Sequence, residues 1–358
     1  MKLAMTLLVR DEADVLRSHL EFHLHAGVDI VIVTDHGSID GTREILEEYE
    51  RQGAVDVLRE PASAEFRQRE WMTRMGRLAA TKHGADWVIN SDADEFWWPR
   101  GGSLEQVLEA IPSRYGIVQT FVRHFMPVAA GDQPFFERMV YRLSPQAPIN
   151  DPTSPWRPFR KVIHRASSDS VVTEGAHGLV GSGLRPLRGW YPIEVLHFPV
   201  RSPEQFERKG LVWKSAVAKY YSGEAVPSAP GAVYHALAYQ ASEEGTSGEH
   251  YASMMLAGDA LGQALADGVV HVDTRLRDAL RLLGAGAQHL AFPRLSVAED
   301  ALFAVDVAAL GEGDVIRTQR RLDGLEARLG AVERTLPARI ERRLRAFVRR
   351  HDRNEGSP

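Results

Sequence analysis

The first 92 residues alternate between short apolar runs and segments with helical spacing, and this alternation restricts the fold more than any other feature. The apolar runs are residues 2–9, 29–34, 55–58 and 87–90. Apolar residues recur at helical spacing between them, over residues 15–24, 43–52 and 65–83. Such alternation with short links indicates parallel strands joined by right-handed crossovers. The sequence therefore predicts an α/β fold, with a mostly parallel sheet flanked by helices.

Polar clusters follow three of these predicted strands. They are Arg10-Asp11-Glu12, the turn that begins at Asp35, and Asp92-Ala93-Asp94. In doubly wound sheets, ligands bind outside the carboxyl ends of the strands. We therefore expect these clusters to converge at one edge of the sheet and to form an active site there.

The third cluster places three carboxylates within four residues: Asp92, Asp94 and Glu95. Side chains two apart in an extended chain point the same way, so Asp92 and Asp94 would repel each other. A divalent cation such as Mg²⁺ or Mn²⁺ removes this conflict, because hard cations prefer carboxylate oxygens. The alternative is a solvated acidic turn.

Aromatic residues near this cluster favour a sugar ligand. Tryptophan faces that are exposed often pack against a bound ring. The candidates for stacking on donor or acceptor rings are Trp97, Trp98, Trp156 and Trp190. Burial of each tryptophan in the core is the alternative.

Composition narrows the class of protein. The net charge of −5 over 358 residues gives no reason to expect a nucleic-acid partner. The chain has no cysteine, which excludes disulfides and thiolate metal sites and fits a reducing compartment. No apolar run reaches the roughly 18–20 residues that span a bilayer, and the N-terminus reads as a strand rather than a signal peptide. We expect a cytoplasmic protein, with possible peripheral contact at the inner face of the membrane.

The organisation changes after Pro99. Further strands are predicted near residues 117–123, 139–142, 160–164, 171–172 and 194–198, and they suit an antiparallel extension of the sheet. A helix with basic residues is predicted over 203–219, and a Pro/Gly/Ser-rich link follows it. We expect a catalytic domain over 1–220, a mainly helical region over 221–310, a coiled-coil and basic amphipathic helix over 311–351, and a disordered tail over 352–358.

The segment 311–351 combines two patterns. The leucines and valine at 322, 325, 329, 332 and 336 form a coiled-coil seam. After Pro337, an apolar stripe continues among arginines, as in a basic amphipathic helix. The segment could pair with a second copy of the chain or lie on an anionic membrane. A solvated helix packing on its own protein is the alternative.

Three motifs together carry a resemblance to a known family. Val9-Arg10-Asp11-Glu12, the turn Asp35–Thr42, and Asp92-Ala93-Asp94-Glu95-Phe96 resemble the family 2-like glycosyltransferases of the GT-A (Rossmann-like) fold. The chain looks most like the bacterial branch with an Asp-x-Asp-Glu-Phe metal motif, over about residues 1–210. Asp11 departs from the asparagine common in that branch, a change that keeps the shape and adds charge. His36 lies at a variable position of the turn and reads as neutral.

The resemblance implies an enzyme that moves a sugar from a nucleotide-diphospho-sugar donor to an acceptor hydroxyl, with inversion and with Mn²⁺ or Mg²⁺. The acceptor would be a glycan or a lipid-linked molecule. Asp35 would bind the nucleotide base, with Arg10, Asp11 and Glu12 nearby. Asp92 would lie at the ribose or share the metal, and Asp94 would bind the metal. Candidate cations for the diphosphate are Arg69, Arg74, Arg77 and Lys209, each of which could instead be a surface charge.

Two later histidines are candidate metal ligands: His177 and His197. Either could instead be structural, and the glycines beside His177 favour it over His197. A general base must take the proton of the acceptor hydroxyl. Glu174 and Asp151 are the candidates, and Glu95 could serve as the base or orient the sugar.

Two other classes of protein compete with this reading. One is a non-catalytic sugar- or nucleotide-binding protein that assembles through its C-terminal helices. The other, which fits less well, is a phosphatase with Asp92 as nucleophile, because such enzymes carry the aspartate pair after an N-terminal strand.

Overall fold

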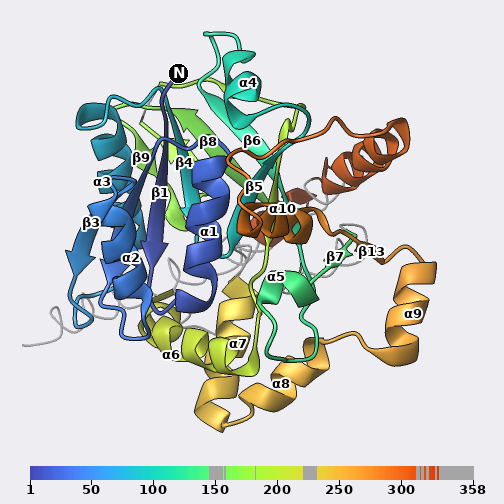
Figure 1. The fold of residues 1–358 in the computed structure, drawn as a ribbon. Coiled ribbons are helices and arrows are strands. Elements are labelled where there is room, and N and C mark those ends of the chain that lie inside the picture. Colours follow the sequence, from blue (N-terminus) through green and yellow to red (C-terminus); the bar gives the residue numbers. More distant parts are fainter. Residues whose placement is uncertain are drawn as a thin grey trace, which may run out of the picture. The chain divides into compact units, whose positions relative to one another are not determined.

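The structure is a computed structural model that describes residues 1–144, 156, 159–181, 183–220 and 232–311, together with 315, 318–319, 322–326 and 329 (Figure 1). The chain divides into two compact units, Met1–Val307 and Ala308–Pro358. In the second unit, the described residues are helical. Most of the predicted coiled coil and basic helix (311–351) and all of the predicted tail (352–358) lie outside the described residues.

The alternation predicted for the first 92 residues is confirmed. Its elements are β1 (Leu3–Val9), α1 (Ala13–His25), β2 (Ile30–His36), α2 (Thr42–Arg51), β3 (Val55–Glu60), α3 (Gln68–Thr81) and β4 (Trp87–Asp92). β1 lies between β2 and β4 and is parallel to both. β3 extends the sheet beyond β2, also in parallel. The local pattern of hydrophobic residues was therefore sufficient to predict this half of the sheet.

Four later strands complete the same sheet, in the order β3-β2-β1-β4-β8-β6-β12-β5. They are β5 (Glu95–Pro99), β6 (Ile117–His124), β8 (Arg160–Arg165) and β12 (Ile193–His197). β8 runs antiparallel between β4 and β6, and β12 is parallel to β6 but antiparallel to β5. β11 (Pro186–Leu187) pairs with β6 beside this path. The predicted fold class, a mostly parallel α/β sheet with antiparallel parts, is confirmed.

The remaining elements are short strands and helices. Two small sheets pair β7 (Tyr141–Leu143) with β13 (Val270–Val272), and β9 (Val171–Val172) with β10 (Leu179–Val180). The helices are α4 (Leu104–Glu109), α5 (Phe135–Arg138), the 3-10 turn η1 (Glu174–Ala176), α6 (Pro203–Tyr220), α7 (Ala232–Glu244), α8 (Ser247–Met254), α9 (Gly258–Ala266) and α10 (Arg275–Gly284). Residues 297–311 are also helical. In the described part of the chain, no helix has the length and apolar character that crossing a membrane requires.

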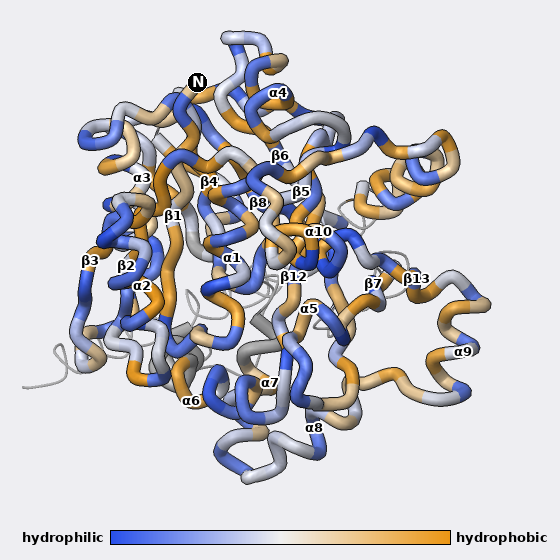
Figure 2. The backbone as a smooth tube through the Cα atoms, in the orientation of Figure 1, coloured by the Kyte–Doolittle hydropathy of each residue, from blue (hydrophilic) through white to orange (hydrophobic). Residues whose placement is uncertain are grey.

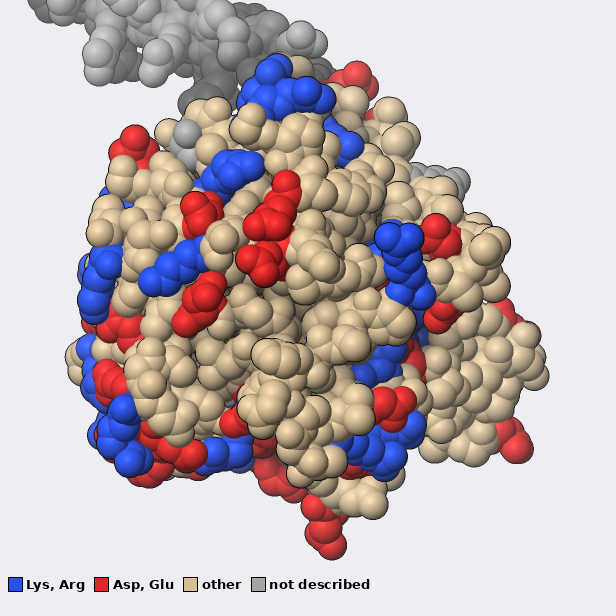
Figure 3. Space-filling model, turned by 45° about the horizontal axis from the view of Figure 1, so that its top comes forward, with Lys and Arg blue, Asp and Glu red and all other residues tan. Residues whose placement is uncertain are grey.

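Helices cover both faces of the sheet. Alternate residues of β1, including Leu3 and Met5, pack in one core cluster with α1, α2 and α10. Ala4 packs on the other face, against α3 and Val172. Figure 2 shows the hydrophobic residues gathered along β1 and its neighbours, and Figure 3 shows acidic and basic side chains interspersed on one face of the surface. Burial of apolar side chains on both faces accounts for the continuous apolar strands.

For Trp97 and Trp98, the structure shows the second alternative, burial in the core, and not stacking on a sugar ring. Both side chains are buried, because β5 pairs with β12 at the end of the main sheet and packs into the hydrophobic core. The Trp97 indole N–H donates to Ser91 Oγ at 2.9 Å, and the Trp98 ring lies 4.9 Å from that of Phe292. Trp156 is half-buried, and Trp190 remains 43% exposed.

A buried ionic network holds the second half of the sheet to the segments that follow it. We call it the balanced network. Its members are Arg123, Arg142, Glu194, Asp273, Arg275 and Asp306. Arg123 of β6 donates to Glu194 of β12 at 2.5 Å and also pairs with Asp306. Three arginines face three carboxylates, so the network carries no excess charge.

Candidate active site

The carboxyl ends of β1, β2 and β4 lie at one edge of the sheet, as predicted. In the strand register, Val9 is level with Asp35, and Leu8 is level with Asp92. β1 is the central strand of the three. Polar residues that are far apart in sequence are therefore neighbours at this edge.

Asp11 connects the first two loops of this edge. Its backbone N–H donates to Ser38 Oγ at 3.0 Å, and its Oδ1 accepts the Ile39 N–H at 2.7 Å. Its φ of +56° lies in the left-handed region, which Asp and Asn tolerate better than most residues. These contacts explain why aspartate can stand where the resembling branch has asparagine, since either side chain supplies the accepting oxygen.

Asp35 is buried at the end of β2. Its Oδ1 accepts the Ser38 N–H at 3.0 Å and the Ser38 hydroxyl at 2.6 Å. Since β1 and β2 place this carboxylate beside the first loop, Asp35 is fixed in position. Its second oxygen has no hydrogen-bond partner within the part of the chain that the structure describes.

His36 has a structural role that the sequence reading missed. Its Nε2 lies 3.0 Å from the Ala64 carbonyl, and its Nδ1 lies 3.4 Å from a guanidinium nitrogen of Arg10. Its ring packs 4.8 Å from that of Trp71, and burial lowers the pKa of the imidazole. The imidazole can donate to the carbonyl through Nε2 and accept from Arg10 through Nδ1. His36 therefore holds the Arg10 side chain at the carboxyl ends of the strands. The sequence analysis had predicted a position without a specific role.

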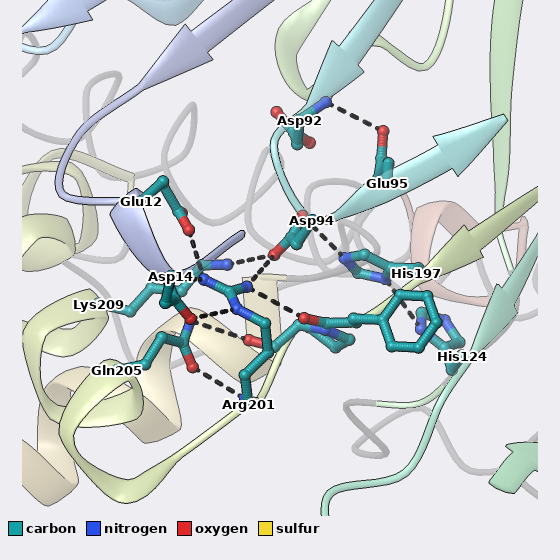
Figure 4. Close-up of polar contacts among 12 residues, drawn as sticks. Glu12, Asp14, Asp92, Asp94, Glu95, His124, His197, Arg201, Gln205 and Lys209 are labelled. Atoms are coloured by element: carbon teal, nitrogen blue, oxygen red, sulfur yellow. Dashed lines mark hydrogen bonds and ion pairs between the residues drawn. The ribbon is translucent and has the colours of Figure 1, made fainter. Parts of the chain in front are cut away.

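Asp94 lies at the centre of a charged cluster (Figure 4). Lys209 of α6 donates to its Oδ2 at 2.6 Å, and His197 Nε2 lies 3.5 Å from its Oδ1. A guanidinium nitrogen of Arg201 is 3.6 Å away. Burial alone would raise the pKa of Asp94, but Lys209 and His197 outweigh burial and hold the pKa well below its usual range. Asp94 is therefore held in its charged form by these neighbours.

Arg201, which the sequence analysis missed, ties the first helix to this cluster. It is buried and forms two hydrogen bonds with Asp14, at 2.7 and 2.9 Å. It also donates to Glu12 Oε2 at 2.5 Å. Burial raises the pKa of Glu12, although Arg201 opposes the rise. Arg201 lies four residues beyond His197, and this place after a strand end was the only sequence signal for it.

Asp92 and Glu95 form a second group, turned away from Asp94 in Figure 4. The Lys161 ammonium on β8 lies 2.7 Å from Asp92 Oδ2 and 3.0 Å from Glu95 Oε1. Glu95 Oε2 accepts the Asp92 N–H at 3.1 Å. Burial raises the pKa of Glu95 to about 7, although Lys161 opposes the rise. Glu95 is buried between Lys161 and the Asp92 N–H, a position that suits support of the turn, and its role as a base stays a prediction.

The structure reverses the order of preference between the two histidines. His177 Nδ1 contacts the Arg160 carbonyl at 3.0 Å, and burial lowers its pKa to about 4. His197, at the end of β12, is the histidine next to Asp94. Its Nδ1 lies 3.1 Å from Nδ1 of His124, at the end of β6. The glycine beside His177 instead makes room for its own ring, since a Cβ on Gly175 would lie 2.5 Å from His177 Nε2.

Other predicted residues are not brought to the cluster. Arg74 pairs with Glu60 at 2.7 Å, and Arg77 donates to the Ser170 carbonyl at 3.3 Å. Arg69 is exposed near the start of α3. Glu174 lies in η1, but its side chain is outside the described residues, as is the whole of Asp151.

The charges at this edge are not balanced. We call the group the acidic cluster. Its carboxylates are Glu12, Asp14, Asp92, Asp94 and Glu95, and its cations are Lys161, Arg201 and Lys209. By formal charge the carboxylates exceed the cations by two, although the raised pKa values of Glu12 and Glu95 reduce the excess. Among the described residues, no three His, Asp or Glu side chains converge as a metal site. The pair Asp94 and His197 fits the sparser type of site, in which one or two protein ligands share the cation with substrate phosphates.

One family model matches part of the chain. Residues 5–171 match the model of glycosyltransferase family 92. No curated protein sequence matches the chain.

Solved structures with detectable similarity include two complexes with nucleotides. S. aureus TarS 1-349 in complex with UDP-GlcNAc is 13% identical, with 68% of this chain and 71% of that chain covered and a TM-score of 0.31. Glucosyl-3-phosphoglycerate synthase from Mycobacterium tuberculosis, with Mn²⁺, UDP and glucosyl-3-phosphoglycerate, is 14% identical. The match covers 46% of this chain and 57% of that chain, with a TM-score of 0.25. The family match over residues 5–171 supports a glycosyltransferase as the class of this protein.

Proposed function

We propose that this protein transfers a sugar, with inversion, from a nucleotide-diphospho-sugar to a hydroxyl group of a glycan or lipid-linked acceptor. The observation that carries the proposal is the convergence of Asp35, Asp92 and Asp94 at the edge formed by β1, β2 and β4. The family 92 match over the same part of the chain supports it. The family 2-like resemblance remains part of the proposal.

The donor would lie across the three strand ends. The second oxygen of Asp35 would accept a hydrogen bond from the base, and Asp92 would bind the ribose. Lys209 would contact the diphosphate, and the 2.6 Å distance between its ammonium and Asp94 supports this role. Arg69 and Arg74 remain further candidates for the diphosphate, although Arg74 already pairs with Glu60 at 2.7 Å.

A divalent cation, Mn²⁺ or Mg²⁺, would be held by Asp94 and His197 together with oxygens of the diphosphate. When bound, such a cation stabilises the negative charge that develops on the leaving nucleoside diphosphate. His124 would fix the tautomer of His197 through the 3.1 Å contact between their Nδ1 atoms. The excess negative charge of the acidic cluster supports this assignment.

The transfer itself needs a base on the acceptor side. The acceptor oxygen would form a bond to the anomeric carbon as the bond to the diphosphate breaks, and the hydroxyl proton would pass to a carboxylate. Glu174 and Asp151 remain the proposed candidates. Lys209 and Arg201 would limit charge build-up near the departing diphosphate.

A thermal-shift panel tests the proposal. UDP-, GDP- and dTDP-sugars are added with and without Mn²⁺, and release of the nucleoside diphosphate is measured for the ligands that bind. Binding to the folded state raises the melting temperature by linkage. We expect one nucleotide class to raise it, and Mn²⁺ to increase the effect. A protein stabilised by a nucleotide-sugar that never releases the diphosphate, with a range of glycan acceptors, would instead be a binding protein.

The change Asp94→Asn tests the metal assignment. It keeps the shape but removes the charge, so we expect the turnover rate to fall by about 10²–10³ and the Mn²⁺-dependent stabilisation to disappear. Asp132→Asn is the matched control, because Asp132 is exposed and lies in the loop before α5. Circular dichroism confirms that both variants fold. An Asp94→Asn variant with the activity of the control would rule out the metal role.

The segment 311–351 is proposed, on its sequence alone, to mediate self-association or contact with an anionic membrane. Its basic amphipathic pattern supports this. Truncation after Gly311 should leave transfer unchanged and alter the size measured by light scattering or the binding to anionic liposomes. Unchanged size and unchanged liposome binding would contradict the proposal.

A further inference from the structure

Lys161 is a buried lysine in the middle of the sheet, and neither the motifs nor the mechanism above uses it. It lies on β8, where Thr120 of β6 is its cross-strand neighbour. Its exposed fraction is 1%. A lysine is rarely buried to this degree without a charged partner, because an unpaired ammonium loses its hydration.

The antiparallel placement of β8 brings this ammonium to the Asp92–Glu95 turn. β4 and β8 pair with Ile89 level with Ile163. Continuing the register by two residues sets Lys161 level with Ser91, next to Asp92. The ammonium then contacts Asp92 at 2.7 Å and Glu95 at 3.0 Å.

These contacts close a ring across the turn. Lys161 bridges the two carboxylates, and Glu95 accepts the backbone N–H of Asp92 at 3.1 Å. Asp92 is thus held through both its side chain and its backbone. The Asp92 side chain is still 37% exposed, whereas that of Lys161 is 2% exposed. A ligand at the sheet edge can therefore reach Asp92 but not Lys161.

We propose that Lys161 is a positioning residue, which fixes the Asp92 carboxylate so that its outer oxygen faces the donor. Glu95 is the second support of the same carboxylate. The inference rests on the proposed function, because it assigns Asp92 to the donor. It also separates the two aspartates of the motif: Asp92 is oriented by Lys161, while Asp94 lies among Lys209, Arg201 and His197.

A double-mutant cycle tests the proposal. The binding of UDP and of GDP, with Mn²⁺ in excess, is measured by calorimetry for wild type, Lys161→Met, Asp92→Asn and the double variant. We expect each single change to weaken the binding of the accepted nucleotide about tenfold. The double variant should bind no more weakly than Asp92→Asn alone, since Lys161 acts only through Asp92. Lys82→Met, which removes an exposed lysine paired with Asp56, is the control.

A second readout does not depend on the ligand. Amide hydrogen exchange of the peptide around residues 91–96 should speed up in Lys161→Met, because the turn loses its bridge. If the methionine variant does not fold, Lys161→Gln is tested in the same way. Wild-type affinity in a folded Lys161 variant, or additive losses in the double variant, would overturn the positioning role. Wild-type protein that binds neither UDP nor GDP, and no dTDP-sugar in the thermal-shift panel, would overturn the proposed function and this inference with it.

Discussion

Two groups of charged side chains lie on the same sheet, the partly exposed acidic cluster and the buried balanced network, and they differ in the ratio of carboxylates to cations. In the balanced network, three arginines face three carboxylates. In the acidic cluster, five carboxylates face three cations. Arg123 of the network and His124 beside the cluster are successive residues of β6, so their side chains point to opposite faces.

The pKa values of the carboxylates reflect this difference. In the balanced network, burial alone would raise the pKa of Glu194, but Arg275 and Arg123 outweigh burial and lower it. In the acidic cluster, burial raises the pKa of Glu12 and of Glu95, because too few cations compensate. A network that neutralises itself can serve stability alone. A cluster that stays acidic supports a further positive charge, as a site for a cation would.

The largest expected effect on stability is in the balanced network. Arg123→Met leaves Glu194 and Asp306 without their shared cation, and removing one partner from buried ion pairs costs about 3–5 kcal/mol. We expect the free energy of unfolding in urea to fall by about that amount. Arg59→Met is the control, since the Arg59–Glu50 pair is exposed and should contribute less than about 1 kcal/mol. Equal losses in the two variants would mean that the network is not a stabilising unit.

The next largest effect on stability is expected from Glu194→Gln, which we compare with Glu12→Gln in the acidic cluster. Glu194→Gln removes the charge that two arginines share, at 2.5 and 2.7 Å, and should cost about 2–3 kcal/mol at pH 7. Glu12→Gln removes a carboxylate whose pKa is raised, so its charged form is already disfavoured, and the cost should stay below about 1 kcal/mol. Urea titrations at pH 7 compare the two.

The pH dependence sharpens this comparison. The pKa of Glu194 is lowered in the folded state, so its contribution is fully present above the unfolded value near 4.5 and is lost as pH falls below it. The difference in free energy of unfolding between wild type and Glu194→Gln should therefore become smaller below pH 4.5. A gap that stays constant to pH 3 would show that the charge of Glu194 does not stabilise the fold.

The same two groups show how far the sequence could predict the site. Asp35, Asp92 and Asp94 follow strands with strong local patterns, so their meeting at one edge was predictable. Lys161 reaches Asp92 only because β8 inserts between β4 and β6, a long-range pairing that local pattern does not encode. A lysine inside the apolar run Val162–Ile163 was the one available signal, and it was read as an ordinary strand residue.

The errors in the prediction have a similar cause. Trp97 and Trp98 were left open between stacking on a sugar and burial in the core, and the return of β5 beside β12 buries them. His177 was preferred over His197 on the strength of its glycines, whereas the end of a sheet strand placed His197 beside Asp94. In both cases the position within the sheet outweighed the local sequence.

The smallest predicted effect comes from a buried ionisable group outside both groups, and it gives the baseline for burial alone. His164 of β8 is buried, its Nδ1 lies 2.9 Å from the Arg165 carbonyl, and burial lowers its pKa to about 4. The unfolded state therefore binds more protons between pH 6.5 and 4, so stability falls as pH drops through that window. Between pH 7.5 and 5.5, His164 alone should lower the free energy of unfolding by about 1.4 kcal/mol. Urea titrations at both pH values should show that His164→Gln loses less stability than wild type by this amount. An identical loss of stability in the two proteins would mean that burial does not suppress protonation of His164. The opposite pKa shifts of Glu194 and of Glu12 and Glu95 would then need a cause other than burial without enough nearby cations.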